Sequence, residues 1–468
     1  MSGISEFMKK DISFKRKPSA KAETKAEKTA AKATTAEPEA PSAEATATTQ
    51  ENAPKKRSLS PKLSLPKRAS KQEKAPKAET TPSAEDTPQA EKAPKQKRSL
   101  SLPKRTPKQK NVSSTNTNGR HKQVVGLSVG ASQLAAAVVV NNGRPKLVKV
   151  ARHTLPPEIV VGGEVRDSEA LANEIAAFFS AADLPRKNVR LGIGSTRTGV
   201  RVFERPEVDD PRQLANAIRF RAYETLPIPI EEAMLDYQIL EEKNGPDRVL
   251  LAVAYRDLVD RFAETCAAAK IELVGIDIEA FALLRAVGGE PLSAGERAEA
   301  ARVAVSIGHD RTTVAVSDGR LCEFTRVLDW GGARVTAAVQ RALDVDAEEA
   351  EQIKRSLDIS VTTPTDEPAD ERTTKAAEAA RREVNGLARE LASSLHFYQD
   401  QVDSLGFAEI TVTGGGAHLQ GLAEQLEELI GISVRLADPF VRVGSGHGIS
   451  SNGQDGALAV AIGLGIED

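Results

Sequence analysis

The sequence has few of the residues that build disulfide frameworks, metal sites or membrane spans. It holds two cysteines in 468 residues, and Cys266 and Cys322 both lie in apolar stretches typical of reduced core thiols. Its histidines show no metal-ligand spacing with cysteine or glutamate, so we expect no metal centre built from side chains. The longest apolar runs, 134–140 and 457–466, are shorter than the roughly 18–20 residues of a membrane-spanning helix. No apolar segment typical of a secretory signal precedes them, and we therefore expect a cytoplasmic protein.

Charge is distributed unevenly along the chain. Residues 1–120 contain 27 Lys and Arg against 13 Asp and Glu, a net charge of +14, whereas the other residues carry −16. The same stretch holds 12 of the 25 prolines and only two aromatic residues, Phe7 and Phe14. Such a segment cannot bury enough apolar surface to offset the loss of backbone entropy on folding. We predict a disordered, basic N-terminal tail over residues 1–121.

A basic phrase with leucine, serine and proline occurs twice in this tail, at 56–68 and 97–105. One interpretation is solvating low-complexity sequence. Another is a set of short linear motifs that dock on an acidic protein surface or on anionic lipid. We expect no nucleic-acid binding, because the tail lacks interleaved aromatic residues and the rest of the chain is acidic.

Two similar hairpins follow the tail. Residues 124–144 read as a strand, a turn with Gly130, a second strand and a turn at Asn142-Gly143, and residues 302–320 repeat this order with a turn at Gly308. A duplicated hairpin predicts a protein of two lobes that face each other across a cleft. A ligand between the two turns would meet backbone N–H groups from both sides, an arrangement suited to phosphate.

A third glycine cluster, Gly414–Gly416, follows a predicted strand and precedes a predicted helix. The three elements, in this order, resemble the two phosphate motifs and the adenosine motif of the actin, hexokinase and heat-shock-chaperone ATPase superfamily. Residues 350–354 and 456–464 are similar to two further stretches of that superfamily, the first approaching the ribose and adenine. The resemblance implies ATP as a cofactor, with magnesium held only through the nucleotide. The nucleotide-binding residues that it implies are Gly126, Ser128, Gly130, Ala131, Ser132, Ser306, Gly308, His309, Thr312, Glu351, Lys354, Gly414, Gly415 and Gly416.

Within this superfamily, residues 226–240, 274–286 and 384–399 resemble the PilM family of type IV pilus assembly proteins, which is related to the division protein FtsA. The resemblance extends over residues 122–468. It implies an α/β, two-lobed actin-like ATPase fold with a small inserted α+β domain. The predicted boundaries are 122–195 and 276–300 for the first lobe, 196–275 for the insert and 301–468 for the second lobe.

The sequence departs from active superfamily members at two positions. These members carry an aspartate two residues before each turn glycine, where Ser128 and Ser306 stand here. Serine brings no negative charge to anchor magnesium, so we expect a weak or degenerate nucleotide site with very slow or absent hydrolysis. The alternative is a nucleotide site that is lost altogether. Glu279 matches the acid that positions water in bacterial actins, or else it is a helix N-terminal glutamate favoured by the helix dipole. His309 either contacts phosphate or caps the second turn.

The family resemblance also implies a function. It predicts a scaffold at the inner face of the cytoplasmic membrane that binds the N-terminal tail of the membrane protein PilN and links PilN and PilO to the pilus motor ATPases. The alternative is an active actin-like ATPase that polymerises, as FtsA and MreB relatives do, and self-association is left open. A sugar kinase is disfavoured because no acidic base motif for a sugar hydroxyl is evident. A further alternative is an adaptor recruited to the membrane through its basic tail.

Overall fold

The structure is a computed structural model that describes residues 123–225, 229, 231–242, 245–293, 296–360, 370–445 and 455–467. The tail predicted over residues 1–121, with its repeated basic phrases, lies outside this part of the chain. Within the described ranges, no helix combines the length and the apolar character needed to cross a membrane.

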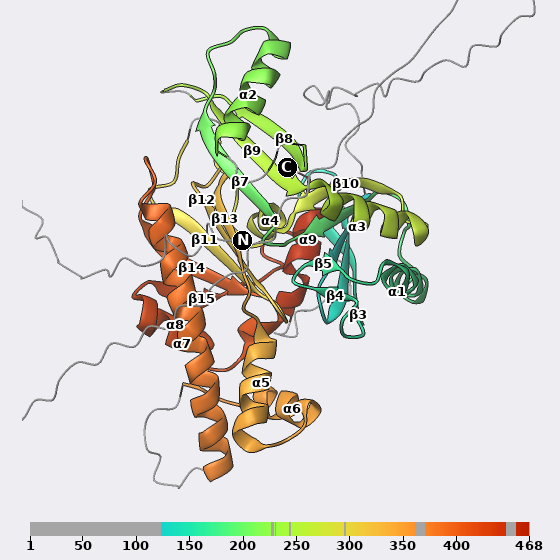
Figure 1. The fold of residues 1–468 in the computed structure, drawn as a ribbon, viewed down its shortest axis with the longest axis vertical. Helices are drawn as coiled ribbons and strands as arrows, with labels where there is room; N and C mark the ends of the chain where they lie inside the picture. Colours follow the sequence, from blue (N-terminus) through green and yellow to red (C-terminus); the bar gives the residue numbers. More distant parts are fainter. Residues whose placement is uncertain are drawn as a thin grey trace, which may run out of the picture. The chain divides into compact units, whose positions relative to one another are not determined.

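The first sheet has six strands in the order β10-β6-β1-β2-β3-β16. Figure 1 shows β10 and β3 of this sheet on the right of the view. The predicted hairpin is confirmed, since β1, β2 and β3 pair antiparallel, while β6 and β10 run parallel to β1. Alternate residues of β2 enter two different cores, which explains its unbroken apolar run. The strands are β1 Gln123–Val129, β2 Gln133–Val140, β3 Lys146–Thr154, β6 Val189–Ile193, β10 Leu273–Ile278 and β16 Gly444–Ser445. A short hairpin, β4 Val160–Val161 and β5 Glu164–Val165, follows β3.

Helices cover both faces of the first sheet. The residues Leu134, Ala136 and Val138 face a core shared with α1 (Ser168–Ala181) and α3 (Arg256–Ala268). On the other face, Ala135, Ala137 and Val139 pack against α9 (Ala459–Gly465).

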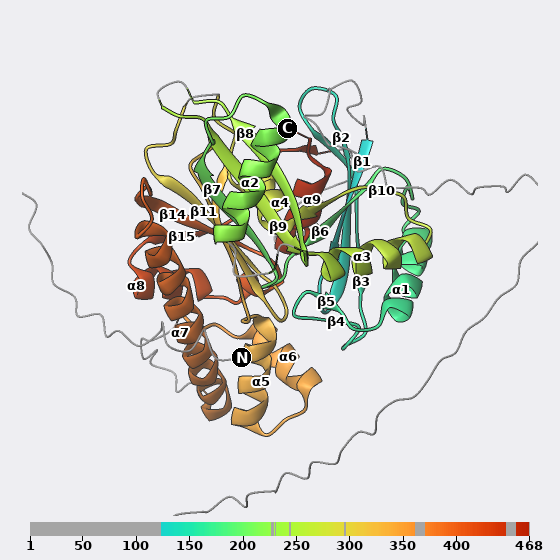
Figure 2. The same ribbon diagram turned by 45° about the horizontal axis from the view of Figure 1, so that its top comes forward.

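The second sheet has five strands in the order β13-β12-β11-β14-β15, and its first three strands form the second predicted hairpin. Its larger core lies against the 29-residue helix α7 (Glu371–Gln399), which presents buried residues at helical spacing, among them Val384, Leu387 and Leu391. Figure 2 shows α7 along this sheet, with α5 and α6 beside its lower end. The bounds are β11 Ala301–Ile307, β12 Thr312–Ser317, β13 Cys322–Leu328, β14 Phe407–Thr413, β15 Ser433–Leu436, α4 Glu279–Val287, α5 Gly332–Leu343, α6 Ala347–Ser356 and α8 Leu422–Ile430, with 3₁₀ turns η1 Gly415–His418 and η2 Asp455–Leu458.

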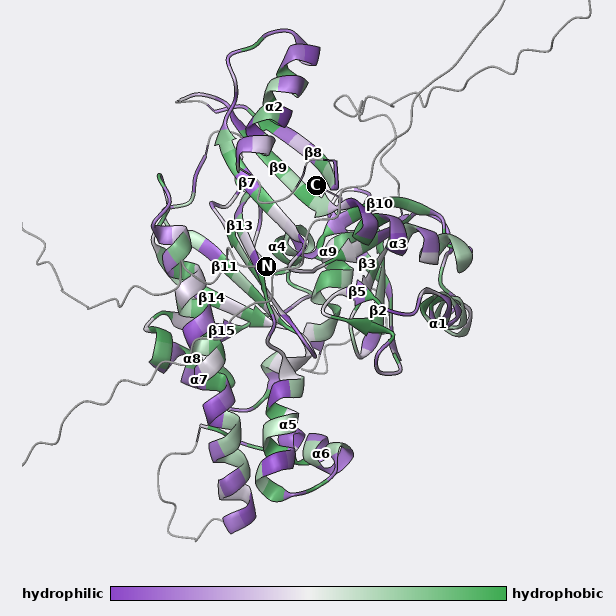
Figure 3. Cartoon of the chain, viewed as in Figure 1, coloured by the Kyte–Doolittle hydropathy of each residue, from purple (hydrophilic) through white to green (hydrophobic). Residues whose placement is uncertain are grey.

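A separate three-stranded sheet, β7-β9-β8, forms the insert. Its strands are antiparallel, and helix α2 (Pro211–Thr225) covers one face through Leu214, Ile218 and Ala222. Apolar colouring concentrates on β9, its central strand, whereas α2 is mostly hydrophilic (Figure 3). The strands are β7 Thr198–Glu204, β8 Ala233–Leu240 and β9 Arg248–Tyr255.

The packing departs from the predicted lobes in two places. Helix α3 was predicted in the insert, but its buried side chains Leu258 and Phe262 lie in the core of the first sheet. Helix α9 was predicted in the second lobe, but Ala461 and Ile462 pack on the first sheet. The apolar face of a helix predicts that this face is buried, but it does not predict which sheet buries it. The remaining lobe boundaries stay a prediction.

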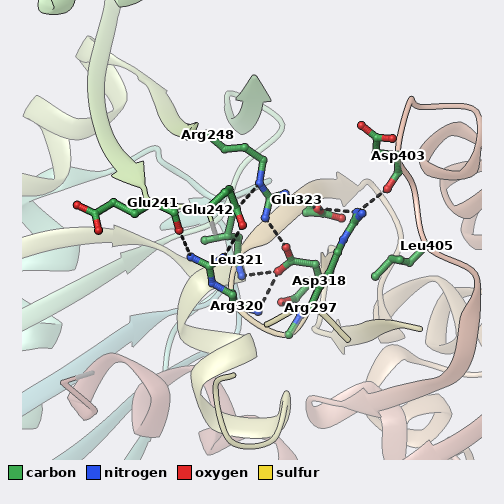
Figure 4. Close-up of polar contacts among 12 residues, drawn as sticks. Glu241, Glu242, Arg248, Arg297, Asp318, Arg320, Leu321, Glu323, Asp403 and Leu405 are labelled. Carbon is green, nitrogen blue, oxygen red and sulfur yellow. Dashed lines mark hydrogen bonds and ion pairs between the residues drawn. The ribbon is translucent and has the colours of Figure 1, made fainter. Parts of the chain in front are cut away.

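A buried charge network joins the insert to the turn between β12 and β13 (Figure 4). Arg248 on β9 donates to Asp318 Oδ2 at 2.7 Å and to Glu323 Oε1 at 2.9 Å. The side chain of Asp318 also accepts from the backbone N–H groups of Arg320 and Leu321. Burial alone would raise the pKa of Asp318, but these hydrogen bonds hold the pKa below its ordinary value. The Asp318 carboxylate is therefore kept charged in the interior.

Candidate functional site

The two predicted turns have the same backbone geometry. The N–H of Gly130 donates to the carbonyl oxygen of Gln133, and the N–H of Gly308 donates to that of Arg311, both at 2.9 Å. The turns face each other across a cleft whose empty space is about 600 Å³, including space open to solvent. Ten of the sequence-predicted residues lie on its wall: Ser128, Gly130, Ala131, Ser132, Glu279, Ser306, Gly308, His309, Gly414 and Gly415.

The glycine cluster after β14 closes a third side of the cleft. Gly414 has a φ of 92°, and a Cβ there would lie 2.3 Å from the carbonyl oxygen of Ile307. Glycine is therefore needed for β14 to end beside β11 and the second turn. Gly416 is not on the cleft wall, and a Cβ there would lie 2.5 Å from the side chain of Ile307.

Four other predicted residues lie away from the cleft wall. Gly126 packs against α9, where a Cβ would lie 2.0 Å from the carbonyl oxygen of Ala461. The hydroxyl of Thr312 donates to the carbonyl oxygen of Trp330 and is fully buried. Glu351 and Lys354 lie on α6.

Glu351 and Lys354 form an ion pair where α5 meets α6. Lys354 Nζ lies 2.5 Å from Glu351 Oε2 and 2.9 Å from the hydroxyl of Thr336. Burial would raise the pKa of Glu351, but hydrogen bonds from Lys354 and Thr336 lower it. The pair stands near Gly416, because both Lys354 Nζ and the Gly416 Cα lie within 4 Å of a Cβ built on Gly332. Their predicted role at the ribose and adenine stays a prediction.

His309 follows the second turn and lines the cleft. Its carbonyl oxygen accepts a hydrogen bond from the N–H of Ala333 at the start of α5, at 2.8 Å. The backbone of His309 thus ties the second turn to the start of α5, and both predicted roles of the residue stay predictions.

Arg311 is the main cleft residue that the sequence analysis missed. It is 7% exposed, and its guanidinium reaches from the second turn to the first lobe. Its Nη2 lies 3.3 Å from the carbonyl oxygen of Val129 and 3.5 Å from Glu279 Oε1. Arg311 takes the place in its hairpin that Gln133 takes in the first hairpin, so a comparison of the two repeats was the signal that could have found it.

Glu279 begins α4 and is 6% exposed. Its Oε2 would lie 2.1 Å from a Cβ on Gly194, so the carboxylate is packed closely against the end of β6. One oxygen of this carboxylate, Oε1, is paired with Arg311. The predicted role of Glu279 in positioning water stays a prediction.

A second contact also crosses the cleft. Asp310 Oδ2 accepts from the N–H of Gly162, in the turn between β4 and β5, at 2.7 Å. Together with the Arg311 contacts, it ties the second turn to the first lobe. Both cleft carboxylates, Glu279 and Asp310, thus already have partners.

His418 at the end of η1, beside the glycine cluster, should make the stability of the fold depend on pH. Burial lowers the pKa of His418 below 6.5 and Arg152 adds to this, whereas Asp455 opposes it. The unfolded chain therefore takes up the proton first, so stability is lost as the pH falls through 6.5 toward the folded pKa.

We expect wild type to lose more thermal stability than His418→Gln between about pH 7.5 and pH 5.5. Melting curves at the two pH values test this, with His396→Gln on the exposed face of α7 as the control. Equal losses in wild type and His418→Gln would contradict it.

The site offers hydroxyl groups, backbone amides and one guanidinium rather than a cluster of carboxylates. Over the described ranges, no group of three or more His, Cys, Asp and Glu residues is placed to hold a metal ion. Amides, hydroxyls and a guanidinium are donors that suit phosphate oxygens. The arrangement favours binding of an anion over metal-assisted hydrolysis.

The chain is similar to several known proteins. A family model described as type IV pilus assembly protein PilM matches residues 126–468. A chain of the solved PilM-PilN type IV pilus biogenesis complex is similar, with a TM-score of 0.60 and 25% identity, covering 73% of this chain and 97% of that chain. The cell division protein FtsA of Bacillus subtilis (strain 168) is 23% identical over 179 residues, which are 36% of this chain and 41% of that protein. This chain thus spans about two fifths of that curated relative. MreB5 of Spiroplasma citri bound to AMPPNP is similar with a TM-score of 0.44 and 13% identity, covering 74% of this chain and 95% of that chain.

Proposed function

Because the chain belongs to the PilM family of type IV pilus assembly proteins, we propose that it is a scaffold of pilus assembly rather than an active ATPase. The predicted actin-like α/β fold is confirmed by the same family and its solved relative. In the proposal, the protein binds the N-terminal tail of PilN on the cytoplasmic side of the membrane and links PilN and PilO to the motor ATPases. The observation that carries it is the likeness, over 97% of the other chain, to a protein solved as a PilM-PilN complex.

The insert offers a surface in support of peptide binding. Its strand β8 is at the edge of the sheet, so one side of its backbone is available for pairing. Tyr237 and Ile239 on this strand are 39% and 38% exposed. An extended peptide can add to such an edge and place apolar side chains beside these two.

The binding test is a titration of the full chain with a synthetic peptide of the PilN tail from the same genome. We expect saturable binding, and Tyr237→Ser should weaken it about tenfold, because exposed aromatic residues often anchor peptide interfaces. A scrambled peptide and Val402→Ser, which changes a residue 91% exposed on another element, serve as controls. Absence of saturable binding would refute the PilN assignment, and equal affinity of Tyr237→Ser would place the peptide elsewhere.

Turnover is the second part of the proposal. Ser128 and Ser306 stand on the cleft wall, and the Glu279 carboxylate is paired with Arg311. We therefore expect overnight phosphate release from ATP no faster than in a protein-free blank. Steady release together with ATP-dependent pelleting would instead favour the polymerising ATPase.

The basic N-terminal tail is proposed to recruit the protein to the membrane. We propose that residues 1–121 reach anionic lipid or an acidic partner and hold the protein near the inner face of the membrane. Flotation of the full chain with anionic vesicles at physiological salt tests the lipid arm, and a failure to float would favour a protein partner.

A further inference from the structure

The polar atoms of Arg311 are only partly satisfied. Its Nη2 has the carbonyl oxygen of Val129 and the carboxylate of Glu279 within 3.5 Å. Its Nη1 is buried and has no hydrogen-bond partner among the described residues; Asp310 Oδ1 lies 3.8 Å away. A buried guanidinium N–H without an acceptor costs free energy, so this atom marks a place where an acceptor belongs.

The surroundings of Arg311 suit a phosphate oxygen. The residue lies on the wall of the cleft between the two glycine turns, with Ser128 and Ser306 on the same wall. A guanidinium forms short, charge-assisted hydrogen bonds with phosphate, and it does not lose its charge at any ordinary pH.

Magnesium does not fit the same wall. Magnesium requires oxygen ligands in octahedral geometry, usually with one or two carboxylates. The carboxylates on the described wall are Glu279 and Asp310, and the first pairs with Arg311 while the second accepts from the N–H of Gly162.

We propose that this cleft binds the phosphate groups of a nucleotide without a divalent cation, with Arg311 supplying the positive charge. The inference rests on the proposed nucleotide site but deepens it, since it names the ligand for which the site is built. Hydroxyls of Ser128 and Ser306 donate to the phosphate, while Arg311 pairs with Glu279 and the N–H of Gly162 donates to Asp310.

The test is a calorimetric titration of the full chain with ATP, once with excess magnesium and once with EDTA. We expect dissociation constants within about threefold of each other, because the site itself takes no metal. Arg311→Gln should weaken ATP binding in EDTA by about 10- to 100-fold, the usual effect of losing a charge-assisted hydrogen bond. Glu279→Gln should tighten it, because Arg311 then has no competing carboxylate. Arg341→Gln, on the exposed side of α5, makes the same chemical change outside the cleft and should bind as wild type.

Arg311→Gln leaves Glu279 buried without its partner, so the variant is checked by a melting curve. If it does not fold, the double variant Arg311→Gln with Glu279→Gln carries no lone charge and is read in its place. Binding that is lost in EDTA, or wild-type affinity without Arg311, would overturn the proposal. So would an absence of ATP binding in both buffers. The PilN titration, run on the same protein, then shows separately whether the scaffold function stands.

Discussion

Replacing Asp318 with alanine is expected to destabilise the folded chain by about 2–3 kcal/mol, because buried hydrogen-bond donors lose their acceptor while Arg248 keeps Glu242 and Glu323 as partners. The side chain of Asp318 is completely buried, and it accepts from Arg248 and from two backbone N–H groups. Without it, the guanidinium of Arg248 loses its 2.7 Å partner, and both N–H groups lose their acceptor. A loss of this size should lower the melting temperature by about 3–4 °C.

The insert gives this prediction a second readout. Arg248 is on β9 of the insert, whereas Asp318 is in the turn before β13, so the variant should loosen the insert from the second sheet (Figure 4). Asp318→Asn, which keeps an acceptor for the backbone, should lose less stability than Asp318→Ala. The control is Asp209→Ala, at an exposed position. Melting of Asp318→Ala within about 1 °C of wild type would show that the network does not stabilise the fold.

Acid should act on the same pair. Since the pKa of Asp318 is held below its ordinary value, its contribution to stability is present above that value and is lost as the pH falls through the folded pKa. Wild type and Asp318→Ala should therefore converge in stability at low pH.

Replacing Gly126 with alanine is expected to destabilise the protein by about 3 kcal/mol, the upper range for overpacking a core. A Cβ at Gly126 would lie 2.0 Å from the carbonyl oxygen of Ala461 and 2.7 Å from the Cβ of Leu464. Both contacts belong to α9, so the helix must move away from β1. Ala457 and Val460, which line the cleft, would move with it.

This prediction separates two roles for Gly126, which the sequence placed among nucleotide-binding residues. If its role is packing, Gly126→Ala lowers the melting temperature in the absence of nucleotide. Gly386→Ala is the matched control, since a Cβ there meets nothing within 4 Å and alanine should stabilise the middle of α7 by about 0.5–1 kcal/mol. A variant of Gly126 that melts like wild type but no longer binds nucleotide would support direct contact instead.

Much of the fold followed from local patterns. The two hairpins and the strand before Gly414–Gly416 are confirmed where the sequence predicted them. Strand alternation, glycine turns and helical spacing depend on neighbours in the chain, so the sequence reports them directly. The glycine turns also located the cleft, because only glycine permits such close backbone approach.

The chain by itself therefore determined the family, the repeated hairpins and the absence of two carboxylates at Ser128 and Ser306. Tertiary structure alone decided that α3 and α9 pack on the first sheet, and that Gly126 lies against α9. It also brought Arg311 to Glu279 and Val129, across 32 and 182 residues of chain. Such contacts depend on how the lobes meet, and the charge of an arginine in a turn does not reveal which distant carboxylate or carbonyl oxygen it will reach.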